Sequence, residues 1–289
     1  MVLNKISKIK KLGIFVLLFI FLVLSILNIK YKVIAFHVYN ANEGRQFRVL
    51  TWNICGSSIE DKEKQEKIAR LIIAQNADFV QLNEFGINYF KVIDSIMSVS
   101  YSYKEYIGAQ VQAGDVLYSK NPVVESGLLN TDIPQVIFLK TYFGKDSLYI
   151  MGCHLAGNNR EGKIEIDDAD SLGKVKTFWH YYRNAQEKRK EHLHFLKNAV
   201  QERSLPMIVM GDMNDFNHSA PMDSLRDAGM KNAWWEGGLG YGATYHEGWL
   251  RLRIDHIYYN ERLCLKNVKV VNTDLSDHNI LIADFSFNN

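Results

Sequence analysis

The sequence predicts an α/β fold that follows an apolar segment at the N-terminus. Three observations lead to this fold class. A strand, a helix and a second strand can be traced between residues 47 and 84, and short apolar runs of strand length follow between residues 115 and 155. Residues 205–214, L-P-M-I-V-M-G-D-M-N, have the pattern of a buried strand that ends in polar side chains. With only four prolines in the chain and no low-complexity run after residue 45, one compact domain over residues 46–289 is expected.

The N-terminal segment has the features of a membrane anchor. Residues 1–11 are basic, with four lysines, and residues 12–29 carry no charge. A run of that length is just sufficient to span a bilayer as a helix, and no A-x-A cleavage motif follows it. We therefore expect a transmembrane helix and then a tether over residues 30–45; a cleaved signal peptide and a buried core helix are the alternatives. The larger number of lysines before the run favours an N-terminus in the cytoplasm.

The domain begins with a strand–helix–strand unit. Residues 47–54, F-R-V-L-T-W-N-I, are rich in β-forming side chains and predict a strand with Asn53 near its end. Residues 62–75 predict a helix because apolar residues recur at helical spacing, and residues 78–84 predict the next strand, which ends at Glu84. Such a unit places Asn53 and Glu84 at one edge of a sheet, where open α/β folds bind ligands.

The middle of the chain is expected to form a helix over residues 86–97 and then mainly strands. Four short apolar runs separated by turn signals predict strands at residues 115–119, 123–128, 135–143 and 147–155. The last run contains His154 near its end. A single histidine in such a place is more often structural than catalytic, so His154 becomes a candidate only together with the other polar strand ends.

A loop, a helix and the buried strand follow. Residues 156–176 are polar and irregular and predict a loop, and residues 178–202 predict a helix with an apolar stripe. The basic side of this helix, which is expected to face solvent, consists of Arg183, Lys188, Arg189 and Lys190. In the strand, Gly211 permits a sharp turn, and Asp212 and Asn214 point the same way because they are two residues apart. An ordinary turn after a core strand is the alternative.

The C-terminal part supplies the remaining polar candidates. Residues 221–228 predict a helix, and residues 253–259, R-I-D-H-I-Y-Y, predict a strand in which Asp255 is the one buried acid. The chain then closes with Asp277 and His278 and an apolar strand over residues 280–287.

The polar side chains at these strand ends suit metal-assisted hydrolysis of phosphate esters. Carboxylate and amide oxygens are ligands for hard divalent cations, and phosphoryl hydrolysis requires a cation and a base that orients water. Adjacent Asp277 and His278 can divide this work, with Asp277 on the metal and His278 on a phosphate oxygen, while Asp255 orients the imidazole. A zinc site is less favoured, because neither histidine has a partner at H-x₃-H spacing.

Charge and cysteine content limit the other functions. The formal net charge of +2 does not predict a protein that coats a polyanion, although local basic patches remain compatible with it. Cys55, Cys153 and Cys264 are far apart and odd in number, so free thiols are expected and one disulfide is the alternative.

Seven short motifs together resemble one family. They are W-N at 52–53, L-N-E at 82–84, Y-S-K-N-P at 118–122, H-L at 154–155, G-D-M-N at 211–214, R-I-D-H-I at 253–257 and S-D-H at 276–278. In this order they resemble the endonuclease/exonuclease/phosphatase superfamily, whose fold is that of deoxyribonuclease I. The resemblance runs from about residue 46 to residue 287 and implies a four-layer α/β sandwich of two mixed sheets with helices outside.

The resemblance also implies roles for the candidate residues. Glu84 would be the main carboxylate on Mg²⁺ or Mn²⁺, with Asn53 and Asp277 nearby. Asp212 would orient the attacking water. The groups that would bind or position the phosphate are Asn214, His154, His278 and, behind His278, Asp255. The chain departs from the commoner pattern at Asn83, His256 and Asn279, which puts the substrate rather than the reaction in doubt.

The N-terminal segment and the run G-Y-G-A-T-Y-H at 240–246 resemble membrane-tethered bacterial members of this superfamily. That implies an inner-membrane anchor with the catalytic domain on the periplasmic side, and a monomer is expected. Tyr245 and His246 are expected to line the rim of the cleft, with aromatic core packing as the alternative. The substrate classes left open are phospholipid head groups, sugar or inositol phosphates, and nucleic acid. A catalytically silent, membrane-tethered binding module is the alternative to an enzyme.

Overall fold

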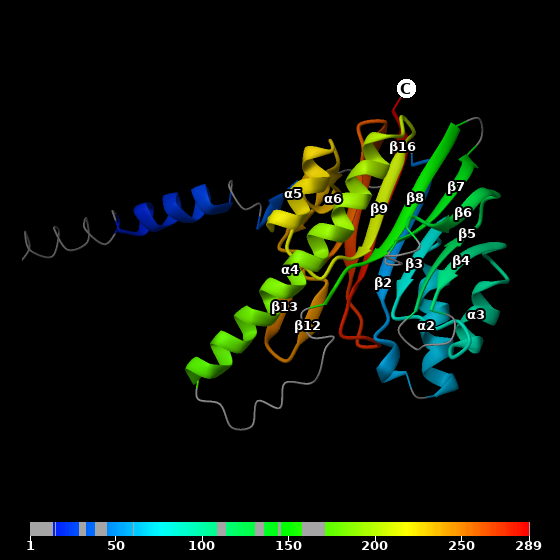
Figure 1. Cartoon of the computed structure of the whole chain (residues 1–289), viewed down its shortest axis with the longest axis horizontal. Coiled ribbons are helices and arrows are strands. Elements are labelled where there is room, and N and C mark those ends of the chain that lie inside the picture. The colour runs from blue at the N-terminus through cyan, green and yellow to red at the C-terminus, as the bar shows by residue number, and fades with distance from the viewer. Residues whose placement is uncertain are drawn as a thin grey trace, which may run out of the picture.

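The computed structural model describes residues 14, 16–28, 33–37, 45–59, 61–108, 114–130, 136–143, 146–157 and 171–288, with the side chains of the long helix α4 described from Tyr182 onward. It contains two six-stranded sheets with helices outside them (Figure 1). The α/β class and the two mixed sheets that the sequence predicts are therefore confirmed.

The first sheet, called the β9 sheet below, has the strand order β10-β14-β9-β8-β7-β6. In that order the bounds are Lys231–Asn232, Asp255–Tyr259, Met207–Asp212, Asp146–His154, Val136–Phe143 and Val123–Leu128. Strands β8 and β9 run parallel, and β9 and β14 run antiparallel. The carboxyl ends of β8 and β9 and the start of β14 therefore share one edge.

The second sheet, called the β2 sheet, has the strand order β15-β16-β2-β3-β5-β4. In that order the bounds are Leu263–Val271, Ile280–Phe287, Phe47–Asn53, Phe79–Asn83, Asp115–Ser119 and Tyr103–Ile107. Strands β2 and β3 run parallel, and β3 and β5 run antiparallel. The ends of β2 and β3 thus lie at the same edge as the beginning of β5.

Apolar side chains fill three layers between and outside the sheets. Val49 of β2 and Ile208 of β9 belong to the cluster between the sheets. On the other face of β2, Leu50 packs with helices α2 (Lys62–Ala74) and α3 (Lys91–Met97), while β9 packs outward against α4 (Ser171–Gln201) and α5 (Ala220–Asp227). Strands that are covered on both faces are apolar without alternation, which explains the uniform composition of β9.

Two helix boundaries differ from the sequence-based expectation. Helix α3 begins at Lys91 rather than near Gly86, because residues 86–90 form a turn in which Phe90 N donates to Gly86 O at 3.1 Å and Phe90 has a non-helical ψ of 49°. Helix α4 begins at Ser171, within the stretch expected as loop. The sequence does not predict this start, because the first residues of the helix carry too few apolar side chains to produce a periodic pattern. Residues 158–170 of that expected loop lie outside the described residues.

The N-terminal segment reaches the domain through a short strand. Residues 16–28 are helical, and their large apolar side chains are exposed. Among the residues described, no helix meets the length and apolarity needed to cross a membrane. Most of the expected anchor is covered by this helix, whereas the basic residues 1–11 lie outside the described part. Within the expected tether, β1 (Ala35–Phe36) pairs with β11 (Leu239–Gly240), and Ala35 is fully buried.

Candidate active site

Three candidate side chains lie in one row across the edge of the β9 sheet. Asp212, the last residue of β9, is in register with His154 at the end of β8 and with Asp255 at the start of β14. All three residues are buried. Strand pairing therefore brings together residues that are 43 or more positions apart in the sequence.

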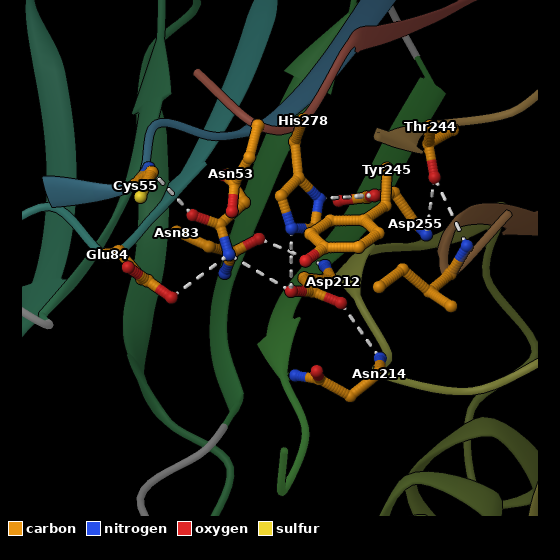
Figure 2. Close-up of polar contacts among 12 residues, drawn as sticks. Asn53, Cys55, Asn83, Glu84, Asp212, Asn214, Thr244, Tyr245, Asp255 and His278 are labelled. Carbon is orange, nitrogen blue, oxygen red and sulfur yellow. Dashed lines mark hydrogen bonds and ion pairs between the residues drawn. The ribbon is translucent and has the colours of Figure 1, made fainter. Parts of the chain in front are cut away.

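The β2 sheet contributes Asn53 and Glu84 to the same place. Asn53 is in register with Asn83, the residue before Glu84. Asn53 and Glu84 therefore share an edge of the sheet, as expected from the strand–helix–strand unit. Asn53 Nδ2 donates to Glu84 Oε1 at 3.3 Å and to Asp212 Oδ2 at 3.0 Å (Figure 2). This amide thus bridges the two sheets within the candidate site.

The chain makes unusual backbone turns where it delivers these side chains. Gly211 has a φ of 147°, and a Cβ atom at this position would lie 1.8 Å from Cys153 O of the neighbouring strand. Glu84 and Asn214 have φ values of 57° and 52°, in the left-handed region that non-glycine residues seldom occupy. Such costly conformations concentrate at functional sites, where the surrounding structure holds them.

His278 forms a close pair with Asp255. Its Nδ1 lies 2.8 Å from Asp255 Oδ2, and its Nε2 lies 3.9 Å from Asp212 Oδ2. Burial alone would lower the pKa of His278, but the hydrogen bond and charge of Asp255, with the charges of Asp212 and Asp277, outweigh it and raise the pKa to about 10. With Nδ1 held by Asp255, the Nε2 atom of the ring faces the Asp212 carboxylate.

The backbone at Asp255 is held in place by the side chain of Thr244, the residue before Tyr245. The backbone N–H of Asp255 donates to Thr244 Oγ1 at 3.0 Å, and the N–H of Ile254 donates to the same oxygen at 3.1 Å. Trp52, which lies on strand β2, donates from Nε1 to His278 O at 2.9 Å. Both members of the Asp255–His278 pair are therefore positioned by residues outside the pair.

His154 is arranged in the same way on the other side of Asp212. Its Nδ1 lies 3.2 Å from Asp115 Oδ1, and its Nε2 lies 3.8 Å from Asp212 Oδ2. Asp115 is the first residue of β5 and is buried. Asp115 is not among the candidates that the sequence indicates, although it is the one acid of the run D-V-L-Y-S. Each histidine thus has a buried aspartate at Nδ1 and presents Nε2 toward Asp212.

Asn83 connects this second pair to Asp212. Its Nδ2 donates to Asp115 Oδ1 at 2.9 Å and to Cys153 O at 3.1 Å, and its Oδ1 accepts from Asp212 N at 3.0 Å. In the sequence Asn83 stood out only as a departure from the family pattern. In the structure its buried amide joins β3, β5, β8 and β9.

Asn214 contacts both Asp212 and the backbone after His154. Its backbone N–H donates to Asp212 Oδ1 at 2.8 Å, and its Nδ2 donates to Leu155 O at 3.0 Å. Figure 2 shows Asn214 beside Asp212, on the side away from Asn53.

The basic side of α4 corrects one expectation from the sequence. Arg183, Lys188 and Lys190 are exposed as expected, but Arg189 is fully buried. Its Nη1 lies 3.1 Å from Asp215 Oδ2, and its Nε donates to Ala156 O at 2.7 Å. Helical periodicity does not reveal this, because the partner that buries the guanidinium is the acid next to Asn214 on another element.

The two rim candidates face different ways. The Tyr245 ring packs edge-on against His278, with ring centroids 5.0 Å apart, and its hydroxyl donates to Glu247 at 2.7 Å. His246 is the next residue of strand β12 (Tyr245–Glu247), so it points to the opposite side, where Nε2 lies 3.2 Å from Thr273 O. The structure therefore brings Tyr245 to the candidate site and places His246 along a separate hollow of about 880 Å³.

Oxygen ligands for a cation gather around Asn53. Ser276 Oγ lies 2.8 Å from Asn53 O and 3.2 Å from Asp277 Oδ1. Glu84 Oε1 accepts from Asn53 Nδ2 at 3.3 Å, and Asn53 Oδ1 accepts from Cys55 N at 2.9 Å. Glu84 and Asp277 are half-buried, and with Asn53 they offer carboxylate and amide oxygens, the type of ligand that Mg²⁺ or Mn²⁺ takes.

A second group also has ligand atoms close together. One potential ligand atom each from Asp212, Asp255 and His278 lies within 4.8 Å of the others. Because Asp255 and the Nδ1 of His278 already bind each other, these groups fit a proton-handling arrangement better than a cation site. All three cysteines are free, as expected.

Comparison with known proteins places this geometry in context. Residues 50–278 match the model of the Endonuclease/Exonuclease/phosphatase family. A UPF0294 protein of Vibrio parahaemolyticus is 25% identical over 130 residues, which cover 44% of this chain and 44% of that relative. The chain thus matches less than half of the length of this curated relative.

Several solved structures share the fold. A humanized TDP2 of D. rerio superimposes with a TM-score of 0.64 at 16% identity, over 83% of this chain and 98% of that chain. The human Nocturnin catalytic domain with a bound sulfate gives 0.62 at 21% identity, over 86% and 97%. An endonuclease/exonuclease/phosphatase from Bacteroides vulgatus gives 0.62 at 16% identity, over 84% and 99%.

Proposed function

Because this chain belongs to the endonuclease/exonuclease/phosphatase family, we propose that it hydrolyses phosphate esters with a bound divalent cation, Mg²⁺ or Mn²⁺. One observation carries this proposal. The buried Asp212 carboxylate lies between two histidines that each have an aspartate at Nδ1, and the Asn53 amide links it to Glu84. This grouping of a carboxylate with two oriented imidazoles supports an enzyme over a catalytically silent binding module.

Asp212 is proposed to orient the attacking water and to accept its proton. Its Oδ1 accepts a hydrogen bond from Asn214 N and its Oδ2 accepts one from Asn53 Nδ2, so the carboxylate cannot rotate freely. A carboxylate fixed in this way holds a water in a defined direction, and general base catalysis depends on that geometry.

The two histidines and Asn214 are proposed to contact the phosphate oxygens. The Nε2 atoms of His278 and His154 lie 3.9 Å and 3.8 Å from the same Asp212 oxygen, so they can converge on a group next to it. Donors that are fixed in advance stabilise charge that develops in the transition state. Asp255 and Asp115 act as positioning residues, because each holds the Nδ1 side of one ring.

Glu84, Asn53 and Asp277 are proposed to hold the cation, which when bound would neutralise charge on the phosphate. Replacing Glu84 with Gln keeps the shape but removes a charge, so more Mg²⁺ should be needed for half-maximal activity. The measurement is a metal titration of wild-type and Glu84→Gln protein, with Glu187→Gln on the exposed side of α4 as the control. Activity that survives EDTA unchanged would refute the metal requirement.

The substrate remains within the classes that the sequence leaves open. One similar structure is TDP2 of D. rerio in complex with a single-stranded DNA product, which keeps nucleic acid among them. The near-neutral charge of this chain is less typical of proteins that follow a phosphate backbone, so phospholipid head groups and sugar or inositol phosphates are favoured. A panel of these three substrate classes, tested on the full chain with Mg²⁺ and with Mn²⁺, decides among them.

We also propose that residues 12–29 anchor the protein in a bacterial inner membrane, with the domain on the periplasmic side. The support is the uncharged run and the exposure of the apolar side chains on the helix over residues 16–28. Protease added to spheroplasts should then digest the domain. A domain that is protected in spheroplasts and cut only after lysis would show the opposite orientation.

A further inference from the structure

The end of the apolar N-terminal helix is hydrogen-bonded to the segment that leads into the domain. Asn28, the last residue of the described helix, donates from Nδ2 to Ile34 O at 3.1 Å, and its Oδ1 accepts from Ile34 N at 2.6 Å. The end of the helix therefore lies within hydrogen-bond reach of the segment that enters the domain.

That segment is in turn fixed on the domain surface. Strand β1 pairs with β11, His37 N donates to Gly238 O at 3.0 Å, and Ala35 is fully buried. The buried Arg253 donates from Nη1 to Val33 O at 3.4 Å and to Tyr241 O at 2.7 Å. The direction in which the helix leaves is thus set by contacts on both sides of Ile34.

Large apolar side chains are exposed around this exit point. We call this surface the exit face; it consists of Val33, Ile34, Phe36, Phe216 and Leu239. Phe36 and Leu239 are register partners in the β1–β11 pair and are 72% and 64% exposed. Val33 and Phe216 line one hollow of about 380 Å³. An apolar cluster left in water on a folded domain marks a contact surface.

We propose that the exit face rests on the lipid bilayer. The partner is indicated by the chain itself, because a bilayer that surrounds residues 16–28 must end close to Ile34 and so meets the side chains next to it. Apolar and aromatic side chains are favourable at the boundary between acyl chains and head groups. This inference rests on the anchor proposed above and is independent of the hydrolase chemistry.

The test uses the full chain in phosphatidylcholine–phosphatidylglycerol vesicles. Leu239 is replaced by the photocrosslinker p-benzoylphenylalanine, and the matched control carries it in place of Val99, which is 86% exposed. Val99 follows helix α3, on the side of the domain away from the N-terminal helix (Figure 1). After irradiation, mass spectrometry should find lipid adducts at position 239 and none above background at position 99.

The outcomes separate the proposals. Equal adduct yields at the two positions in protein that sediments with vesicles would overturn the exit face as a bilayer contact. Crosslinks between two copies of the chain at position 239 would also overturn it, in favour of a dimer surface. Protein that does not sediment with vesicles would overturn the anchor and this inference together. Hydrolysis of a soluble phosphate ester, measured on the same samples, tests the proposed activity separately.

Discussion

Asp212 receives its two side-chain hydrogen bonds from different parts of the fold, one from Asn214 in its own loop and one from Asn53 in the other sheet. Replacing it with Asn keeps the size of the side chain, but it turns one of the two accepting oxygens into an NH₂ donor and removes the proton acceptor. We predict that Asp212→Asn lowers kcat by about 100-fold or more, because general base catalysis contributes on that scale. Asp227→Asn on the exposed side of α5 is the control, and circular dichroism melts check that both variants fold. Turnover close to wild type would remove Asp212 from the reaction.

His256 shows how one buried ring makes stability depend on pH. Its Nε2 lies 2.9 Å from Asp215 O, an acceptor, so Nε2 carries the proton. Its Nδ1 lies 3.1 Å from Asn232 Nδ2, a donor, because Asn232 Oδ1 already accepts from Trp235 N. Nδ1 therefore has no acceptor for a second proton. Burial, with the nearby charge of Arg253, lowers the pKa of His256 to about 3.

The pKa of His256 in the folded chain lies below the value of about 6.5 in the unfolded chain. At a pH between the two values, His256 is therefore protonated in the unfolded chain and neutral in the folded chain. Between pH 6.5 and 3 this histidine alone makes the free energy of unfolding fall by up to about 1.4 kcal/mol per pH unit as pH decreases. We predict that His256→Phe, although less stable at pH 7 through its lost hydrogen bonds, has a shallower slope. Urea unfolding of both proteins at pH 7, 6 and 5 measures the difference, in which the other titrating groups cancel. Parallel slopes would contradict a neutral, buried His256.

Strand β9 depends on Gly211 for its close packing against β8. Gly211 sits where β8 passes so closely that an added Cβ atom would lie 1.8 Å from Cys153 O, a backbone atom that cannot turn away. We predict that Gly211→Ala lowers the free energy of unfolding by about 3 kcal/mol or more, through overpacking as well as strain. Gly229→Ala is the matched control, because Gly229 also has a positive φ, of 84°, but nothing lies within 4 Å of its Cβ position. The control should cost only about 1–2 kcal/mol. Similar losses in the two variants would contradict the close approach of β8 and β9.

Strand ends explain which parts of the site could be predicted from the sequence. Asn53, His154 and Asp212 each end an apolar run, and residues in that position on neighbouring parallel strands must meet at one edge. Asp115 was missed because it begins its strand, β5, which runs antiparallel to β3, and no family motif marked it in the way that R-I-D-H-I marked Asp255. Strand direction depends on pairing across the sheet, which a local pattern of side chains does not encode.

Contacts between distant segments account for the other differences. Asn83 has the same local pattern as any polar residue near a strand end, yet it binds three partners that belong to other strands. Arg189 lies on a polar side of its helix and becomes buried only because Asp215 and Ala156 O meet it there. The sequence predicts the class of fold and most strand ends, whereas these side chains depend on tertiary packing.

For the molecule as a whole, the short strand β1 joins the N-terminal segment to the domain core. Ala35 is fully buried, and the β1–β11 pair and Arg253 bind the adjoining backbone. A chain that starts at Val33 should therefore be more stable than one that starts at Arg45, by about 1–2 kcal/mol for the backbone hydrogen bonds that are lost. Thermal unfolding measures this as about 2–4 °C per kcal/mol for a domain of this size. Equal melting temperatures would show that β1 adds nothing to the fold.

The candidate site lies at the boundary between the two sheets and takes residues from both. Asn53 and Glu84 belong to the side of the β2 sheet, and His154, Asp212 and Asp255 belong to the β9 sheet. The Asn53 amide makes hydrogen bonds to both Glu84 and Asp212. A small sliding of one sheet past the other would leave every strand and helix intact while it separated Asp212, proposed to orient the water, from Glu84 and Asn53, proposed to hold the cation. The rate of hydrolysis would then report on the alignment of the two sheets. Heat or pressure should abolish hydrolysis well before the secondary structure unfolds.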